Sequence, residues 1–336
     1  MSVNPAPTPA LISTGSALPA QIRTNDDPIF DWLRDNPTYG QQLFTGYNER
    51  RVLGPGETVT SIMVAAARAA LQGQTQPGQA QPVPIEPGQI DMLIGFGSVG
   101  QYVTPNTLAQ VHEELGLDPS TEVLPLANDM TNWASAVVIA DALIKAGRIQ
   151  YALIVCGGNW TQYVDYHTPQ AISAGDGAGA TVVGPSTKPT QWRLVDREWL
   201  TVSQDYGDMF MAADRLPPGS FGPVYMHLTA EGLKDYVAFG EHQATQPVQT
   251  LLTRNDIPAQ QVTMICHQAS MTIINAWRQA LPGVTILQTI ADYANLVLAT
   301  IPVNLDLLGA QITTRYLVTL GLGVQLHAGA LLFERG

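Results

Sequence analysis

The 336-residue sequence is poor in cysteine, in charged residues and above all in cationic ones. Its two cysteines, Cys156 and Cys266, lie within apolar runs, which argues against a disulfide framework and favours a reducing compartment; their spacing does not suggest a zinc site. Lys and Arg number 16 against 28 Asp and Glu, giving a net charge of −12. Because Lys and Arg supply most of the affinity for phosphates, this balance argues against nucleic acid as a partner.

The sequence also lacks a basic segment ahead of its first apolar stretch, since the first lysine of the chain is Lys145. A signal peptide is therefore not expected. No apolar run reaches the length of about 18 residues that a membrane-spanning helix needs. We predict a cytoplasmic protein with no membrane partner.

The apolar segments that are present alternate between two types. Short, continuous or β-branched runs that end in Gly or a polar residue predict buried strands at 11–19, 90–97, 151–158, 180–184, 262–267 and 329–334. Apolar residues at three- and four-residue spacing predict helices at 61–72, 106–117, 133–148, 270–283 and 298–308. The sequence therefore predicts an α/β fold.

The order of strand, helix and strand occurs in the first half of the chain and again in the second, with a polar stretch at 185–195 between them. We predict two similar halves, 1–188 and 189–336. The run at 72–89 is rich in Gln, Pro and Gly and is expected to form an exposed insertion in the first half.

Two glycine-rich motifs invite different interpretations. GFGSVG (95–100) matches a dinucleotide-binding pattern after a strand, but Pro105 delays the following helix and no acidic residue closes a strand about 20 positions later, so no nucleotide cofactor is expected. GDGAGA (175–180) suits a tight turn into a strand at which two backbones approach closely.

His267 ends a predicted central strand and is followed by a predicted helix. Ligands of open α/β sheets gather at such strand ends, so His267 is a candidate site residue, with a buried structural histidine as the alternative. Neighbouring residues on a strand point to opposite faces, so Cys266 is expected in the core rather than in a dyad with His267.

Several segments together resemble β-ketoacyl-ACP synthase III, of the thiolase-fold condensing enzymes, in order and spacing. They are LISTGSALP (11–19), TGYNERR (45–51), ALIKAG (142–147), AGDGAGATVVG (174–184), HQAS (267–270), NLVLATIP (295–302) and LGLGVQLHAGALLF (320–333). The resemblance implies a five-layered α-β-α-β-α fold of two duplicated halves, usually a homodimer, with the active site between the halves.

The resemblance also implies site residues and substrates. His267 and Asn295 would hydrogen-bond a thioester carbonyl and stabilise the enolate formed from an extender unit, and Gly323 would contribute a backbone amide to a second oxyanion hole. The substrate would be a thioester of CoA or phosphopantetheine, delivered as acyl-CoA or on an acyl-carrier protein, and no metal or other cofactor is implied.

The family's nucleophilic cysteine has no counterpart here, because its position falls on Met130, and a thioether cannot form an ordinary acyl-enzyme. Two neighbours leave alternatives open. Thr131 would present a hydroxyl to His267 as a poorer nucleophile, and Asp129 would act as a weak general base at a helix N-terminus. Either residue would instead serve as the N-cap of the following helix.

The contacts to the acyl carrier are also altered. The residues that sandwich the CoA adenine in the family correspond to Gly40 and Phe44, and a family arginine corresponds to Thr272. Trp32 and Arg34, in an altered segment nearby, are candidates to replace the lost pair.

Three further aromatic side chains are candidates for the wall of the acyl channel. Trp133 stands where the family carries an aromatic residue, and Tyr166 and His167 belong to a segment that resembles the channel wall. Surface or core aromatic residues are the alternative. If these residues line the channel, the acceptor is expected to be polar or aromatic rather than a fatty chain.

The sequence therefore predicts a ketosynthase III-like acyltransferase or condensing enzyme of specialised, polyketide- or fatty-acid-type metabolism. It would act on an acyl or malonyl thioester through His267 and Asn295, without a cysteine acyl-enzyme. The alternative is a catalytically silent subunit that forms a heterodimer with an active, cysteine-bearing homologue. Retention of both polar residues favours the enzyme.

Overall fold

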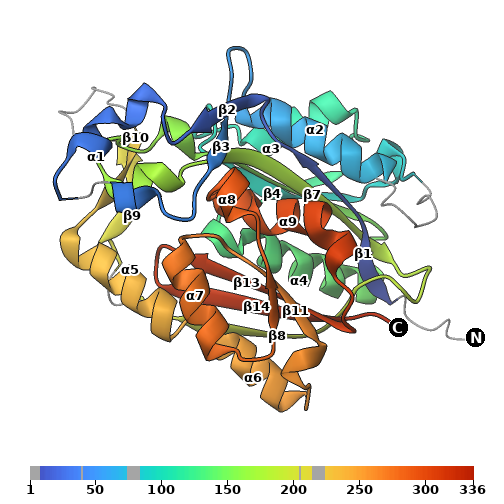
Figure 1. Cartoon of the computed structure of the whole chain (residues 1–336). Helices are drawn as coiled ribbons and strands as arrows, with labels where there is room; N and C mark the ends of the chain where they lie inside the picture. The colour runs from blue at the N-terminus through green and yellow to red at the C-terminus, as the bar shows by residue number, and fades with distance from the viewer. Residues whose placement is uncertain (1–7, 39–40, 74–83, 204–205, 214–223) are drawn as a thin grey trace, which may run out of the picture.

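The computed structural model describes residues 8–38, 41–73, 84–203, 206–213 and 224–336. Two five-stranded sheets dominate it, and helices lie between them and on their outer faces (Figure 1). The strands of the first sheet all come from the chain up to Pro185, and those of the second from Arg193 onward.

The first sheet contains two antiparallel and two parallel pairings. Its order is β1 (Pro9–Ala17), β7 (Asp176–Pro185), β6 (Ala152–Asn159), β4 (Met92–Ser98) and β5 (Glu122–Pro125). The pairings β1–β7 and β7–β6 are antiparallel, whereas β6–β4 and β4–β5 are parallel. β6 is buried along its whole length, as expected of a central strand covered on both faces.

The second sheet repeats this arrangement. Its order is β8 (Arg193–Thr201), β14 (His327–Glu334), β13 (Tyr316–Gly323), β11 (Val262–Cys266) and β12 (Thr285–Leu287). Here too the first two pairings are antiparallel and the last two parallel. The same order and the same directions in two consecutive stretches of chain identify a duplicated unit.

Five layers result from the placement of the helices. α4 (Asn132–Lys145) and α9 (Thr300–Leu308) form the middle layer, because α4 contacts strands of both sheets and α9 contacts β1 and β7 as well as β11 and β13. The outer layers are α2 (Val59–Gln72) and α3 (Thr107–Leu115) on the first sheet, and α5 (Ala230–His242), α6 (Gln246–Arg254) and α7 (Met271–Ala280) on the second. Within the described ranges, no helix combines the length and apolar character needed to span a membrane.

Close backbone approach explains why small residues occur in β7. A Cβ atom at Gly179 would lie 2.7 Å from the backbone nitrogen of Val303 in α9, which only glycine avoids. The expected close approach at residues 175–180 is therefore present, but most of that motif lies inside β7 rather than in a turn.

The two cysteines are core residues, as the sequence predicts. Cys156 and Cys266 are both fully buried among apolar side chains of the two sheets. Burial raises the pKa of the Cys266 thiol to about 12, which keeps this group protonated. Cys266 and His267 therefore form no reactive dyad.

Each strand and helix predicted from periodicity is present, with boundaries moved by one to a few residues. Several elements that the sequence analysis does not predict are short or amphipathic: α5, α6, α8 (Ile290–Tyr293), α1 (Asp31–Asp35), and the two-stranded sheets β2 (Gln21–Thr24) with β3 (Glu49–Val52) and β9 (Met209–Ala213) with β10 (Val224–Leu228). Most of the insertion expected at 72–89 lies outside the described residues, although Gln72 belongs to α2.

Candidate active site

Two short 3₁₀ turns, Asp129–Thr131 and Val297–Ala299, lead into the two middle helices and contact one another. Asp129 precedes α4 by three residues, and Val297 precedes α9 by the same number. Both have a positive φ, 44° for Asp129 and 46° for Val297. The duplicated fold thus brings two equivalent helix N-termini together at one place.

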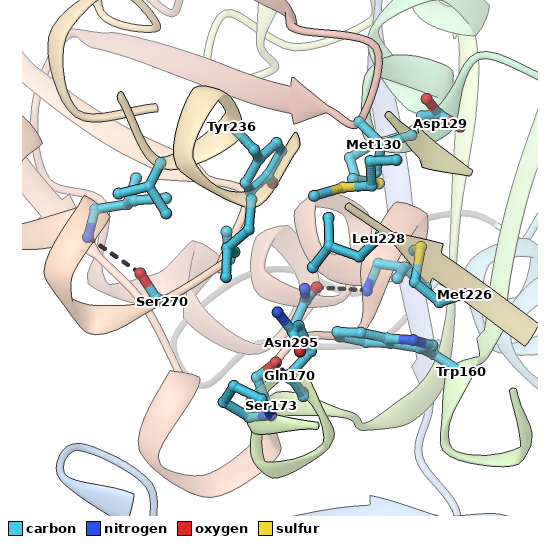
Figure 2. Close-up of a pocket in the computed structure, with 18 of the residues that line it drawn as sticks. Asp129, Met130, Trp160, Gln170, Ser173, Met226, Leu228, Tyr236, Ser270 and Asn295 are labelled. Carbon is cyan, nitrogen blue, oxygen red and sulfur yellow. Dashed lines mark hydrogen bonds between the residues drawn. The ribbon is translucent and has the colours of Figure 1, made fainter. Parts of the chain in front are cut away.

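A cavity of about 1180 Å³ opens beside these turns. Met130 and Asn295 both line it, and their side chains enter it from different directions in Figure 2, with Trp160 and Tyr236 also on the wall. Its volume is above the range of about 300–1,000 Å³ common for small-molecule sites, so it can admit a sizeable substrate. The two halves thus jointly enclose the candidate active site.

Asn295 presents an unused hydrogen-bond donor to this cavity. Its Oδ1 accepts a hydrogen bond of 2.8 Å from the backbone N–H of Val297, and its own backbone N–H donates to the Ser173 carbonyl over 2.8 Å. The side chain is therefore held by its oxygen. Among the described residues, its Nδ2 group has no protein acceptor, so it can donate to a carbonyl oxygen in the cavity.

Gln268 holds the segment that carries Asn295. Its Nε2 donates to the Ala294 carbonyl over 2.9 Å, and its Oε1 accepts from the Thr289 backbone N–H at 2.6 Å and from Asn304 Nδ2 at 2.8 Å. All of these groups are at least partly buried, so the network is protected from water. This positioning role of Gln268 could not be predicted from the HQAS motif, because its partners Thr289, Ala294 and Asn304 lie 21 to 36 positions away.

His267 follows β11, as predicted, but lies behind the cavity wall. It is fully buried, and its backbone N–H donates to the Leu320 carbonyl over 2.8 Å. Neither ring nitrogen has a hydrogen-bond partner of normal geometry in the described part of the chain. Burial lowers the pKa of His267 to about 3, with the backbone of Val297 opposing the shift, so the ring is neutral near pH 7.

Met130 is at the cavity and Asp129 at its edge, as the sequence analysis expects of site residues. Met130 is 8% exposed and sits in the turn before α4. The imidazole of His327 and the backbone amide of Val324 both favour the charged form of the Asp129 carboxyl. Burial raises its pKa, while His327 and the Val324 amide oppose the shift.

Gly323, which was expected to supply a backbone amide to the site, is not among the described residues that line the cavity. Gly323 itself pairs with His327 in the β13–β14 ladder and lies against its imidazole ring. A Cβ atom at position 323 would fall 1.9 Å from the ring, so glycine is required here to accommodate His327.

The expectation that Thr131 presents its hydroxyl to His267 is corrected by the structure. Its Oγ1 lies 2.9 Å from His327 Nε2 and 2.9 Å from the Asn128 carbonyl oxygen. Thr131 is fully buried and is not among the residues that line the cavity. Its side chain therefore links the turn to β14 instead of facing a substrate, and it makes no N-cap hydrogen bond to α4.

Trp133 also has a different role from the one expected. It is fully buried between the sheets, its Nε1 donates to Thr181 Oγ1 over 3.0 Å, and its ring lies 6.1 Å from that of Phe333. It is absent from the cavity lining. The expected substrate contact is therefore replaced by a core contact, because the first turn of α4 points this residue toward the first sheet.

Trp32 and Arg34, the candidates for a carrier contact, lie together in and beside α1, outside the cavity lining. Arg34 donates to the backbone oxygens of Asn25 and Asp27 and pairs with Asp31. Trp32 is 44% exposed and packs edge-on against His167. Arg34 is thus engaged in fixing its own segment.

Tyr166 and His167 are likewise outside the cavity lining. The Tyr166 hydroxyl donates to the Thr161 carbonyl over 2.9 Å and accepts from Arg23. His167 is largely exposed beside Asp165. A polar or aromatic acceptor was expected only if these residues line the channel. They do not line the cavity, so the structure gives that expectation no support.

Comparisons with known proteins agree with this geometry. A family described as 3-oxoacyl-[acyl-carrier-protein (ACP)] synthase III matches residues 126–202, which include Met130 and α4. The beta-ketoacyl-[acyl-carrier-protein] synthase III of Escherichia coli strain K12 is 27% identical over 302 residues, covering 88% of this chain and 89% of that protein. The chain is a β-ketoacyl-ACP synthase III-like protein.

Solved structures place this synthase III-like chain in the thiolase fold. The priming beta-ketosynthase from the R1128 polyketide biosynthetic pathway superposes with a TM-score of 0.83 at 21% identity, covering 100% of this chain and 99% of its own. The 3-oxoacyl-[acyl-carrier-protein] synthase III of Aquifex aeolicus VF5 gives 0.77 at 23% identity, with coverage of 97% and 99%. Xanthomonas campestris OleA gives 0.81 at 16% identity, with coverage of 98% and 99%.

Sequence reasoning missed much of the cavity wall of this synthase III-like chain. The β9–β10 hairpin and α5 supply part of that wall. Methionine is common on it, at Met130, Met209, Met211, Met226 and Met271. Asp129 is the sole charged side chain among the described lining residues, and none is Lys or Arg. Flexible thioethers adapt to irregular apolar ligands, so the wall suits an apolar substrate portion.

Proposed function

We propose that this protein is an acyl-transferring enzyme that uses an acyl thioester without forming an acyl-enzyme. One observation carries the proposal: a thioether, Met130, shares one cavity with an amide donor, Asn295 Nδ2, that has no acceptor within the described ranges of the chain. The amide supports stabilisation of a thioester oxyanion. The thioether has no proton to lose and cannot act as the nucleophile.

Two reactions fit these groups. A bound amine, alcohol or carbon nucleophile can attack the thioester carbonyl directly, with Asn295 donating to the oxygen as negative charge develops on it. A malonyl thioester can lose CO₂, with the same donor stabilising the enolate. The neutral imidazole of His267 can supply a second donor through one ring nitrogen, if a small movement of the wall exposes it.

The proposed substrates are thioesters of CoA or phosphopantetheine, presented as acyl-CoA or on an acyl-carrier protein. The names of relatives refer to acyl-carrier protein, and one structural neighbour is a priming β-ketosynthase of a polyketide pathway. The methionine-rich wall supports an apolar acyl group. We further propose a homodimer in the cytoplasm and a role in specialised metabolism.

Intact-protein mass spectrometry with parallel measurement of free thiol tests this function. Acetyl-, malonyl- and octanoyl-CoA are mixed with the wild type, Asn295→Ala and Asn295→Asp, in the presence of benzyl alcohol as the acyl acceptor. We expect thiol or CO₂ release without a mass adduct in the wild type, and a loss of about 100-fold or more in both variants. Asn295→Asp is the matched control, because its carboxylate still accepts from Val297 N–H but cannot donate. A stable adduct on the wild type would contradict the proposal.

A second candidate function is a silent subunit that pairs with a cysteine-bearing homologue. Met130 favours it, because loss of the nucleophile is what such a subunit tolerates. The two functions separate in the same experiment. Complete absence of turnover, together with a requirement for a second polypeptide to remain in solution, would support the silent subunit.

A further inference from the structure

A chain of buried polar groups connects the turn before α4 with the start of β14. Thr131 Oγ1 lies within hydrogen-bond distance of both the Asn128 carbonyl oxygen and His327 Nε2. A carbonyl can only accept, so the single hydroxyl proton of Thr131 goes to Asn128. His327 Nε2 must then carry a proton and donate it to Thr131 Oγ1.

This assignment leaves the other ring nitrogen of His327 with a free lone pair. His327 is 2% exposed, and its Nδ1 has no hydrogen-bond partner among the described residues. A buried ring nitrogen without a hydrogen-bond partner lowers the stability of the fold, and such groups often occur at functional sites. Burial lowers the pKa of His327, and the negative charge of Asp129 opposes the shift.

Asp129 lines the cavity and interacts electrostatically with this imidazole. Its carboxyl interacts electrostatically with His327 and with Tyr236, and the backbone amide of Val324 favours its charged form. Asp129, Val324 and Tyr236 all line the cavity, and Asp129 adjoins Met130 at its edge (Figure 2). The positive φ of Asp129 is a strained backbone conformation of the kind that gathers at functional sites.

We propose that Asp129 is the proton-transfer group of this site and that His327 is its positioning residue. The inference rests on the function proposed above. In direct acyl transfer, the acceptor oxygen or nitrogen forms a bond to the thioester carbon while its proton passes to the Asp129 carboxylate. The carbon–sulfur bond then breaks, and the leaving thiolate takes that proton, so no other reagent is consumed.

His327 acts on Asp129 in two ways, through a hydrogen bond to the turn and through its charge. Its Nε2–H fixes Thr131 and thereby the turn that carries Asp129 and Met130. Its ring also lies in the electrostatic field of the carboxyl, so its charge state governs how readily Asp129 gives up a proton. The other titratable group found to act on this pair is Tyr236.

The pH dependence of thiol release tests the proposal. Octanoyl-CoA is the donor, and benzyl alcohol is the acceptor because it does not titrate between about pH 5.5 and 8.5. We expect Asp129→Asn to lower kcat by about 100-fold or more, to leave KM nearly unchanged and to remove the acid limb of the profile. Removing a group whose charge lowers the Asp129 pKa should move that limb to higher pH in His327→Gln.

The glutamine variant separates positioning from folding. Its side-chain N–H can still donate to Thr131, so the turn is preserved while the titratable ring is lost. Thr131→Ser keeps the hydroxyl and should retain the wild-type profile, and the acid limb should persist in Tyr236→Phe. An Asp129→Asn variant with unchanged kcat and unchanged pH profile would overturn the proposal.

Nuclear magnetic resonance of the His327 ring tests the pair without turnover. Because the Asp129 carboxylate raises the pKa of His327, this ring should titrate at lower pH in Asp129→Asn than in the wild type. An unchanged titration would overturn the pairing. No thiol release from any variant would overturn the proposed function and the catalytic role together, whereas release that Asn295→Ala abolishes and Asp129→Asn does not affect would overturn the role alone.

Discussion

The turns that precede α4 and α9 occupy equivalent positions in the two halves, but one carries polar side chains and the other apolar ones. The first is Asp129–Thr131 and the second Val297–Ala299, and each begins with a residue of positive φ. The first turn carries the Asp129 carboxyl, which interacts electrostatically with His327, and the Thr131 hydroxyl, which is hydrogen-bonded to His327. The second turn carries only apolar side chains, and its first residue, Val297, donates its backbone N–H to the side-chain oxygen of Asn295.

This difference shows how a duplicated backbone can supply two distinct functions at one cavity. The shared geometry points two helix N-termini at the same space, and each half then contributes what the other lacks. The first half offers a group that can exchange a proton, and the second offers a fixed neutral donor. Our predictions test whether the two turns are as different in chemistry as they are alike in backbone.

The largest expected effect comes from placing a cysteine in each turn. We predict that Met130→Cys becomes acylated by octanoyl-CoA, because the N-terminus of the 14-residue α4 stabilises a thiolate in the cavity. Leu298→Cys, at the equivalent place before α9, also lines the cavity but should gain no adduct beyond background. Leu298 packs in the apolar core between the sheets, where burial raises the pKa of a thiol and disfavours the reactive thiolate. Intact-protein mass spectrometry measures both. Equal acylation of the two variants would show that the turns are chemically equivalent.

The second largest difference is expected at the first buried apolar residues of the two middle helices. Trp133 and Ile301 are the second residues of α4 and α9, and both pack in the core between the sheets. We predict a loss of about 4 kcal/mol in unfolding free energy for Trp133→Ala and about 3 kcal/mol for Ile301→Ala, measured by urea denaturation. The folded fraction of Trp133→Ala should keep its KM. A large rise in KM would mean that Trp133 contacts the substrate after all.

The two buried histidines behind the turns should differ in their pH dependence. The pKa of His267 is about 3 in the folded protein, below its ordinary value of 6.5, so the unfolded state binds more protons between these values. Stability is then present above about pH 6.5 and falls, as the pH is lowered, by up to about 1.4 kcal/mol per pH unit. The negative charge of Asp129 opposes the lowering of the His327 pKa by burial. His327 should therefore contribute less than His267 to the loss of unfolding free energy at low pH.

Urea midpoints at several pH values distinguish these contributions. His267→Gln should remove more of the loss between about pH 6.5 and 5 than His327→Gln does. The slope, not the absolute stability, is the readout, because each variant also changes packing. A greater effect of His327→Gln would mean that Asp129 does not offset the burial of its partner.

The sequence predicted the parts of this comparison that depend on local pattern. Helical spacing located α4 and α9, and the resemblance to synthase III located Asn295, through NLVLATIP, and Met130, through its distance from ALIKAG. The pairing of Thr131 with His327 escaped it, because the two residues are 196 positions apart and no local period links them. Trp133 was misplaced because helix rotation, set by packing between two sheets, decides which neighbours an aromatic residue meets.

The cavity wall contributed by β9 and β10 was missed for a related reason. These strands pair only with each other, and their apolar residues face a ligand cavity rather than a sheet core. Such a hairpin has no buried-strand pattern to recognise. The positive φ angles of Asp129 and Val297 could not be predicted either, since neither residue type requires such a φ.

The smallest effect concerns the positive φ of Val297. Valine is disfavoured at positive φ, so Val297→Gly should relieve strain that nearly offsets the lost side-chain contacts and the added chain entropy. We predict an unfolding free energy within about 1 kcal/mol of the wild type. The control is Val303→Gly, at a fully buried place inside α9, which should lose about 3 kcal/mol. Equal losses in urea denaturation would mean that the second turn stores no strain, and that Asn295 holds it in a relaxed conformation.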